Sequence, residues 1–412
     1  MINNKINNLK KRKAKELRFK FYGKIAIAFT LTFLVILFSL ILWRAYPALL
    51  RSQIALNIDL KDYQANSDLE KLDYNLLVKK ALRDKFQEAF DQTIDQKDLI
   101  QSYQILSRIA SFELKEQIVQ NPQFLGSSQL LWFSMSSKAD MYFKYNNYGN
   151  FSAKQLQFLR DLEDDGHVQQ VFNWQFFKNA DSREAEIAGI AVGLGGSLMV
   201  MLIFLILAFP IAVMCAFYLE EFAKKNRLTD IIEISINNLA AIPSIIYGLL
   251  GLVLYLQIMH LPRSSSLVGG MTLFMLVLPV IIIATRNTIR SIPQTIRDGA
   301  YGLGASKLQV TLHHLLPLSI PGIMTGTILA ISRALGETAP LLMIGMVAFI
   351  ADPAQNFFDP ATVLPVQIFL WSDLQENGFI EKTALAILML LMILFLFNLT
   401  AIILRKKFEK KW

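Results

Sequence analysis

The chain has 412 residues, of which 53% are hydrophobic and only 18% are charged. This composition is too apolar for an ordinary globular protein. The net charge of +8 does not indicate nucleic-acid binding, because the basic residues cluster beside apolar runs and are not interleaved with aromatic residues. Cys215 is the only cysteine, which excludes internal disulfides and cysteine-based metal sites.

Six apolar runs are long enough to cross a membrane, which takes about 20 residues of helix. They predict an all-α polytopic membrane protein with spans at residues 25–43, 187–219, 231–259, 267–285, 320–350 and 383–404. The first run is too long for a cleaved signal peptide and lacks a small-residue cleavage site. We therefore expect it to be a retained first transmembrane helix.

The charged flanks of these runs predict the orientation of the chain. Residues 1–24 contain nine Lys or Arg and one Glu, and the tail 405–412 contains five Lys or Arg. Loop 286–319 is also basic, whereas segment 351–382 has five acidic residues and one Lys. Basic flanks stay on the cytoplasmic side. The pattern predicts six spans in membrane lipid, with both termini in the cytoplasm.

Residues 44–186 are a long polar insertion between the first two spans, and the orientation places it outside the cytoplasm. Segments Ser67–Glu70 and Ser152–Gln155 each carry the spacing of a capping box, which predicts helix starts. We expect a small, mostly α domain. It has no cluster of His, Cys or carboxylates with metal-ligand spacing, so we expect no metal site, and docking is a better prediction than catalysis.

The basic loop 286–319 carries a spaced pattern of one acidic residue, several small residues and a distal Leu-Pro. Its elements are Asp298, Gly299, Ala300, Gly304, Ala305, Leu316 and Pro317. Small residues allow a helix to sit deep in a groove on a partner, and glycine allows a turn. Proline is expected to end the segment before the next span.

This pattern resembles the EAA loop of ABC-transporter permeases, in which an acidic-small-small triplet, a Gly and a distal Leu-Pro frame a cytoplasmic helix-turn-helix. Asp298 stands where the family usually has Glu, and His314 where an aliphatic residue is common. The resemblance implies that the loop contacts an ATPase subunit and transmits its closure as a rigid body.

Two further segments, Ile242–Gly251 and Ala330–Pro340, resemble the signatures of PstA-type permeases of phosphate ABC importers. The resemblance covers about residues 188–405, and hence the permease core at 187–404. It implies a bacterial inner-membrane transport subunit that forms half of a phosphate pathway. The implied partners are a PstC-like permease, a PstB-like ATPase dimer and a PstS-like phosphate-binding protein.

The resemblance also implies that ATP and Mg²⁺ are used by the partner ATPase. This chain contains no Gly-x4-Gly-Lys-Ser/Thr phosphate loop, so we expect it to bind no cofactor and to be no enzyme. The insertion is longer than the outer loop of most family members, and the resemblance implies nothing about its role.

Arg333 and Glu337 stand four residues apart within the fifth apolar run. A charge inside a span costs about 3 kcal/mol on insertion scales, so it usually faces a partner or a wet cavity. Guanidinium matches the geometry of phosphate. We predict a substrate pathway formed by these two residues and Thr338, with Arg286 and Arg290 as a basic vestibule. The alternative is a structural ion pair against a second permease subunit.

Pro243 and Gly248 are predicted to break the third span, and Gly336 and Pro340 to break the fifth. Discontinuous helices expose backbone N–H groups that can face an anion. Two other functions stay open. One is a permease for another oxyanion, sulfate or molybdate. The other is a membrane sensor whose outer domain binds a ligand.

Overall fold

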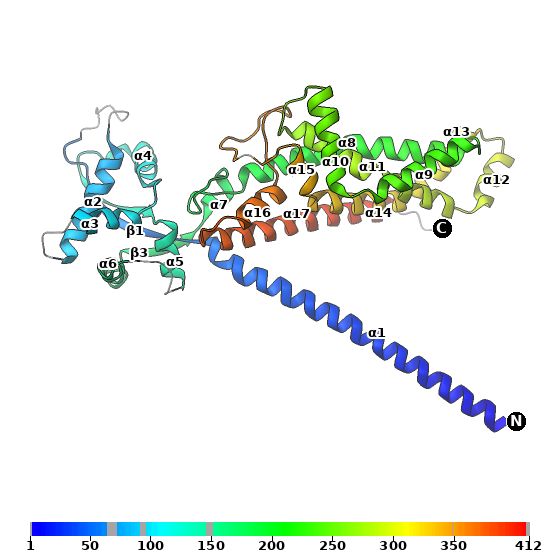
Figure 1. Ribbon diagram of the computed structural model, residues 1–412, viewed down its shortest axis with the longest axis horizontal. Helices are drawn as coiled ribbons and strands as arrows, with labels where there is room; N and C mark the ends of the chain where they lie inside the picture. Colours follow the sequence, from blue (N-terminus) through cyan, green and yellow to red (C-terminus); the bar gives the residue numbers. More distant parts are fainter. Residues whose placement is uncertain (1, 64–71, 91–95, 146–150, 348, 409–412) are drawn as a thin grey trace.

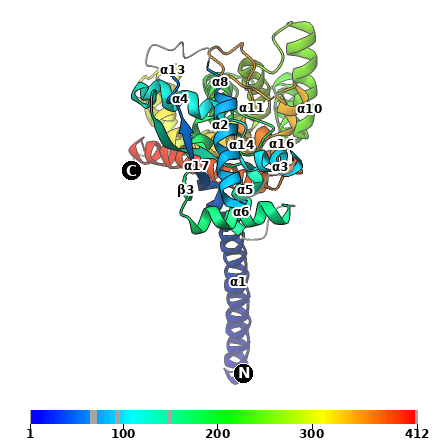
Figure 2. The ribbon, with the colours of Figure 1, turned by 90° about the vertical axis from the view of Figure 1, so that its left-hand side faces the viewer.

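The structure is a computed structural model that describes residues 2–63, 72–90, 96–145, 151–347 and 349–408. Figure 1 shows a bundle of long helices, a smaller domain beyond one end of it, and the single helix α1 (Ile2–Ala45) leaving the junction between them. Seen from a second side, α1 projects away from the rest of the molecule (Figure 2).

Five helical rods in the described chain are long and apolar enough to cross a membrane, and one bent pair of helices adds a sixth span. The rods cover Arg12–Leu49, Ala191–Phe222, Ser266–Ser291, Lys307–Gly336 and Gly378–Lys407. The bent pair is Arg227–Ala241 with Ser244–Ile258, and its halves differ in direction by 103°. The number of spans agrees with the prediction, but the span predicted at 231–259 is not straight.

The bundle is organised around α11 (Ser266–Ser291), which packs against α8 (Ala191–Phe217), α14 (Leu316–Gly336), α9 (Arg227–Ala241) and α10 (Ser244–Gly251). α17 (Gly378–Phe408) lies against α14 and against α1. Short helices α15 (Ala339–Met343) and α16 (Leu364–Ser372) fill the end nearest the small domain. The side chain of Ser265 caps α11 by accepting a hydrogen bond from the N–H of Val268.

The basic segment predicted at 286–319 is mostly helical. α11 continues to Ser291, so Arg286 and Arg290 lie on a helix and not in a loop. After α12 (Gln294–Gly302), α13 (Lys307–Val310) leads through a π-helical turn at Thr311–Leu315 directly into α14. Pro317 therefore does not end the segment. It occupies the first turn of α14, where its missing N–H has little effect.

The insertion contains six α-helices in the described residues. They are α2 (Tyr74–Phe90), α3 (Gln96–Ser102), α4 (Ala110–Gln120), α5 (Ser137–Tyr145), α6 (Ala153–Asp164) and α7 (Trp174–Lys178). The capping box predicted at Ser152 is present. Ser152 Oγ accepts a hydrogen bond from the N–H of Gln155, and the side-chain oxygen of Gln155 accepts one from the N–H of Ser152. The start predicted at Ser67–Glu70 lies outside the described residues.

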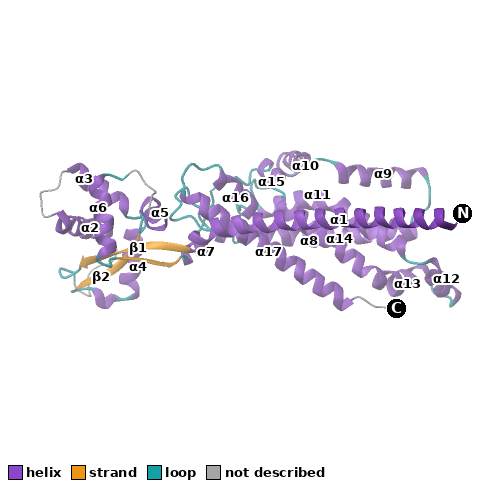
Figure 3. Ribbon diagram, turned by 90° about the horizontal axis from the view of Figure 1, so that it is seen from below, coloured by secondary structure: helices purple, strands orange, loops and turns teal. Residues whose placement is uncertain are grey.

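A three-stranded antiparallel sheet, which the sequence analysis did not predict, accompanies these helices (Figure 3). The order is β2-β1-β3, from β1 (Leu50–Asp59), β2 (Ser128–Ser134) and β3 (Val168–Phe172). The central strand β1 lacks the alternation of apolar and polar residues that predicts a strand, because Ser52 to Leu56 are all buried. β3 has only five residues.

Each part of the molecule has its own apolar core, and a third cluster joins the two. This joining cluster includes Phe176 of α7, Trp371 of α16 and Phe379 of α17, all almost completely buried. Their rings lie 5.6–6.4 Å apart, measured from Phe176 to Trp371 and from Trp371 to Phe379. The insertion is therefore packed onto the end of the bundle and is not merely tethered to it.

Candidate functional site

Each of two helix interruptions is followed by a short helix, and these two helices, α10 and α15, pack against each other. α9 ends just before Pro243, and α14 ends at Gly336. Gly248 lies inside α10 and does not break it. It faces Pro340 instead, and a Cβ on Gly248 would lie 2.7 Å from the Cα of Pro340. The absence of a side chain at Gly248 thus allows α10 to approach α15 closely.

Arg333 and Glu337 lie beside this contact. Arg333 is on the last turn of α14, and Glu337 follows the end of the helix. Their closest charged atoms, Nε and Oε1, are 3.7 Å apart, and the side chains are 34% and 22% exposed. Arg333 is also close enough to the buried Tyr247 of α10 for a Coulombic interaction. Thr338, the next predicted residue, caps α15 with its carbonyl, which accepts from the N–H of Leu342 at 3.0 Å.

Arg286 and Arg290 belong to a different cluster. Arg286 is buried and its Nε donates to Glu220 Oε1 at 2.5 Å, while a second nitrogen pairs with Glu233. Arg290 is more exposed and pairs with the same two carboxylates, at 3.0 Å and 3.4 Å. These contacts tie α11 to α9 and to the π-helical turn Tyr218–Phe222 that follows α8. The two charges predicted as a vestibule are thus compensated by carboxylates of the chain itself.

The next residue of that π-helical turn, Glu221, anchors α12. Arg297 of α12 donates to Glu221 through two nitrogens, at 2.9 Å and 3.2 Å. Its guanidinium also donates to the carbonyls of Ile292 and Ile289, at 2.8 Å and 3.0 Å. Both charged side chains are nearly buried. A π-helical turn often marks a functional position, and this one directs adjacent carboxylates to α11 and α12.

Beyond this anchor, α12 and the turn after it form a hairpin with an open surface. Gly304 adopts a φ of +83°, which makes the turn into α13. Ala300 is buried, whereas Leu303 is 91% exposed. A Cβ on Gly299 would meet nothing within 4 Å. Asp298 accepts a hydrogen bond from Gln294 at 3.2 Å on the exposed side.

The remaining residues of the predicted pattern lie farther along the chain. Ala305 donates its N–H to the carbonyl of Ala300 at 3.1 Å, and Leu316 packs against the core of the bundle. Ala300 and Leu316 therefore face the bundle, whereas Asp298 and Gly299 lie on an open surface.

Sequence reasoning did not find the partners of these arginines. Glu220 and Glu221 end an apolar run and precede a basic loop. Two adjacent acidic residues at the end of a span were the only indication in the sequence that these carboxylates pair with arginines. Which arginine each carboxylate meets depends on how α8, α9 and α11 pack, and spacing along the chain does not contain that information.

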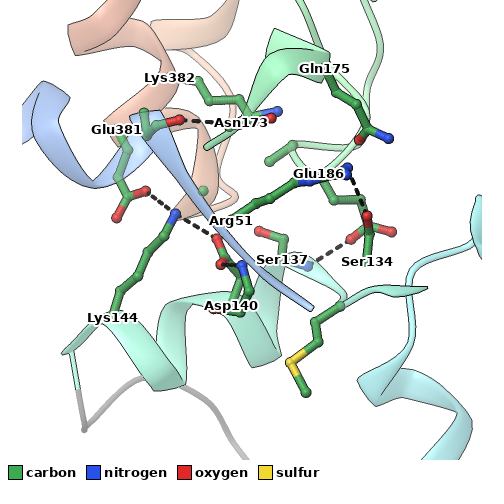
Figure 4. A pocket seen from close by; sticks show the side chains of 15 residues that line it. Arg51, Ser134, Ser137, Asp140, Lys144, Asn173, Gln175, Glu186, Glu381 and Lys382 are labelled. Atoms are coloured by element: carbon green, nitrogen blue, oxygen red, sulfur yellow. Dashed lines mark hydrogen bonds and ion pairs between the residues drawn. The ribbon is translucent and has the colours of Figure 1, made fainter. Parts of the chain in front are cut away.

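A second buried group of charges lies where the insertion meets the bundle (Figure 4). Lys144 of α5 pairs with Asp140 at 2.6 Å and with Glu381 of α17 at 3.1 Å. Lys144 and Glu381 side chains are each only 6% exposed. The next residue, Lys382, donates to the carbonyl of Ala188 at 2.7 Å. The group surrounds a cavity of about 30 Å³ and connects α5, α17 and the segment before α8.

Glu186 completes this junction. It accepts hydrogen bonds from the N–H of Ser137 at 2.7 Å, the hydroxyl of Ser107 at 2.9 Å and the N–H of Arg108 at 3.2 Å. Burial nevertheless raises the pKa of Glu186 above its ordinary value, because the hydrogen bonds offset only part of the desolvation.

A bundle of six apolar spans with an open hairpin at one end defines a polytopic helical membrane protein. The chain belongs to the family of binding-protein-dependent transport system inner membrane components, the permease subunits of ABC transporters, and this family matches residues 208–412. It is therefore an integral protein of the inner membrane. A separate family, a domain of unknown function (DUF3333), matches residues 6–152.

Two relatives illustrate the similarity. The probable ABC transporter permease protein YqgI of Bacillus subtilis (strain 168) is 31% identical over 212 residues, which cover 48% of this chain and 70% of the relative. The phosphate transport system permease protein PstA of Yersinia pestis is 31% identical over 228 residues, which cover 54% and 73%. A solved inward-facing structure of the MetNI methionine ABC transporter aligns with a TM-score of 0.42 and 14% identity, over 54% of this chain and 95% of that one.

We predict that Gly248→Ala destabilises the fold. The added methyl group would collide with the backbone of Pro340, and overpacking of this kind costs about 1–3 kcal/mol. The thermal unfolding midpoint of the purified protein measures the effect. Gly195→Ala in α8 is the matched control, because a Cβ there meets nothing within 4 Å. Equal midpoints for the two variants would contradict the close approach of α10 and α15.

We predict that the stability of the junction falls as pH rises from 4.5, the ordinary pKa of a Glu carboxyl. In the window between that value and the raised pKa of Glu186, the folded chain holds a proton that the unfolded chain has released, so the free energy of unfolding decreases with pH. Glu186→Gln should flatten this dependence in thermal unfolding. Glu88→Gln, at an exposed carboxylate of α2, should not, and an unchanged slope in Glu186→Gln would refute the assignment.

Proposed function

We propose that the chain is one of two permease subunits of an ATP-driven importer of inorganic phosphate. The observation that carries the proposal is its 31% identity, over 228 residues, to the phosphate transport system permease protein PstA of Yersinia pestis. By this proposal its partners are a PstC-like permease, a PstB-like ATPase dimer that uses ATP and Mg²⁺, and a PstS-like phosphate-binding protein. Both termini and the α12 hairpin face the cytoplasm.

The environment of Arg333 supports an anion pathway. Its guanidinium is one-third exposed, and its partner Glu337 is 3.7 Å away, beyond a good hydrogen bond. A phosphate oxyanion can accept two parallel N–H bonds from a guanidinium, which Glu337 does not do here. Glu337 would hold Arg333 in place between substrates, and the anion would replace it during passage.

The hairpin supports coupling to a separate motor subunit. Leu303 and Leu308 are exposed apolar side chains at the tip, where an ordinary soluble loop would be polar. Gly299 leaves the surface of α12 open to close approach. The buried pair of Arg297 and Glu221 fixes α12 to the ends of α8 and α11. A push on the hairpin would therefore move these helices together.

We predict that Arg333→Ala reduces uptake of radiolabelled phosphate by about 10-fold to 100-fold, because a hydrogen bond to a charged group contributes about 1.5–3 kcal/mol. Arg333→Lys keeps the charge without the planar donors and should fall between wild type and Arg333→Ala. Co-purification of the partner subunits is the control. Loss of assembly in Arg333→Ala would instead assign the pair a structural role.

The same uptake assay tests the substrate. Excess unlabelled phosphate should abolish uptake of the label, and sulfate or molybdate should not. Effective competition by either of these would assign the chain to another oxyanion. A sensor would show normal uptake after deletion of the α12 hairpin, whereas a coupled permease would show none.

We predict that Arg297→Gln lowers the number of phosphate ions transported per ATP hydrolysed, because α12 loses its buried ionic anchor. The measurement is parallel uptake and ATPase activity in liposomes containing the complete transporter. Glu221→Gln should act similarly, and the double variant should be no worse than either single one, since both remove one interaction. Arg108→Gln, which removes an exposed ion pair in the insertion, is the control. Full coupling in Arg297→Gln would contradict the anchor.

A further inference from the structure

Four exposed aromatic side chains gather where α1 ends and the insertion begins. Trp43 and Tyr46 lie at the end of α1 and just beyond it, and Trp43 is 82% exposed. Phe172 ends β3, and Trp174 begins α7 and is 63% exposed. Large apolar side chains this exposed are unusual on a water-facing surface when they cluster.

Backbone and side-chain hydrogen bonds hold the segment of Phe172 and Trp174 beside the chain that follows Trp43 and Tyr46. Phe172 stands opposite Leu50, the first residue of β1, in the antiparallel pairing of β1 with β3. Asn173 donates its backbone N–H to the carbonyl of Leu49 at 2.8 Å and its side-chain amide to the carbonyl of Ala48 at 3.1 Å. The start of α7 is thus fixed beside the short 3₁₀ turn Tyr46–Leu49 that follows α1.

The aromatic rings also form a fixed series that reaches into the bundle. The rings of Phe172 and Trp174 are 4.7 Å apart, and those of Phe172 and Phe177 are stacked at 5.9 Å. Phe176, the neighbour of Phe177, contacts the buried Trp371, whose indole N–H donates to Asp181 at 2.8 Å. The exposed aromatic surface therefore cannot turn away from the end of the bundle without disrupting its core.

The apolar part of α1 sets the level of the membrane. The uncharged run ends at Trp43, and the chain from there to Ala48 and Leu49, whose carbonyls accept from Asn173, rises about 8–10 Å at the rises of an α-helix and a 3₁₀-helix. The headgroup layer on each side of the hydrocarbon core is about 5–8 Å thick. Phe172 and Trp174 flank Asn173, so they lie at the outer edge of this layer, where side chains as large as theirs can reach the headgroups.

We propose that Phe172 and Trp174 lie in the headgroup layer of the membrane, together with Trp43 and Tyr46, and that the insertion rests on lipid through this surface. Tryptophan and tyrosine favour this layer because their rings are apolar and their N–H and O–H groups can reach water or headgroups. The surface is continuous with the span α1, so lipid is its natural occupant. The proposal is independent of the transported substrate and of the side on which the insertion lies.

The single cysteine allows a direct test. In a Cys215→Ala background of the full chain, a nitroxide spin label is attached at Trp174→Cys or Phe172→Cys, in vesicles of phosphatidylethanolamine and phosphatidylglycerol. Collision rates with oxygen, which concentrates in lipid, and with a nickel chelate, which stays in water, are compared. Leu130→Cys is the matched control: it is exposed on the same sheet and pairs with Asn57, about 23 Å along β1 from Leu50.

The ratio of oxygen to nickel collisions should be several-fold higher at positions 174 and 172 than at Leu130→Cys. An equal ratio would place the surface in water and overturn the proposal. Protection from both reagents would place it against another protein and would also overturn it. Agreement between the two labelled positions excludes a local disturbance by either label, and neither substitution removes a buried side chain.

Discussion

A charge inside an apolar bundle is costly unless it is paired, and the ion pairs of this protein differ in length and exposure. Arg286 meets Glu220 at 2.5 Å near one end of the bundle, and Lys144 meets Glu381 at 3.1 Å at the other, with little exposure in either pair. The pair of Arg333 is longer and more exposed than both. Of these three pairs, it is the one whose opening by a competing anion would cost the least desolvation, as the proposed role of Arg333 requires.

The same constraint links distant elements of the fold to one another. The hairpin is joined to the bundle by the buried Arg297, and it also continues through α13 and the π-helical turn into α14. The rod from Lys307 to Gly336 has 30 residues, or about 45 Å of helix. Arg333 lies on the last turn of that rod. A displacement at the hairpin therefore reaches the helix end at Arg333 without passing through a flexible loop.

Sequence reasoning recovered the features whose signal is local. The apolar runs gave the spans, and Pro243 and Gly336 coincide with real helix ends. The sheet was missed because its central strand is covered on both faces. Gly248 was assigned to the wrong mechanism, because glycine serves equally for a break and for close packing, and only the neighbouring Pro340 distinguishes them. Ion-pair partners depend on tertiary packing, so composition and spacing could not identify them.

The junction determines what the insertion can do mechanically. Its charges reach α17 through Lys144 and Glu381, and its aromatic residues reach α16 through Trp371. α17 in turn packs along α14, and Ser332 of α14 donates to Asn398 of α17 at 3.2 Å, one residue before Arg333. A domain held by buried ion pairs and packed rings moves as one body with the helix that carries them. A force on the insertion would thus be felt at α17, and through it at the helix that carries Arg333.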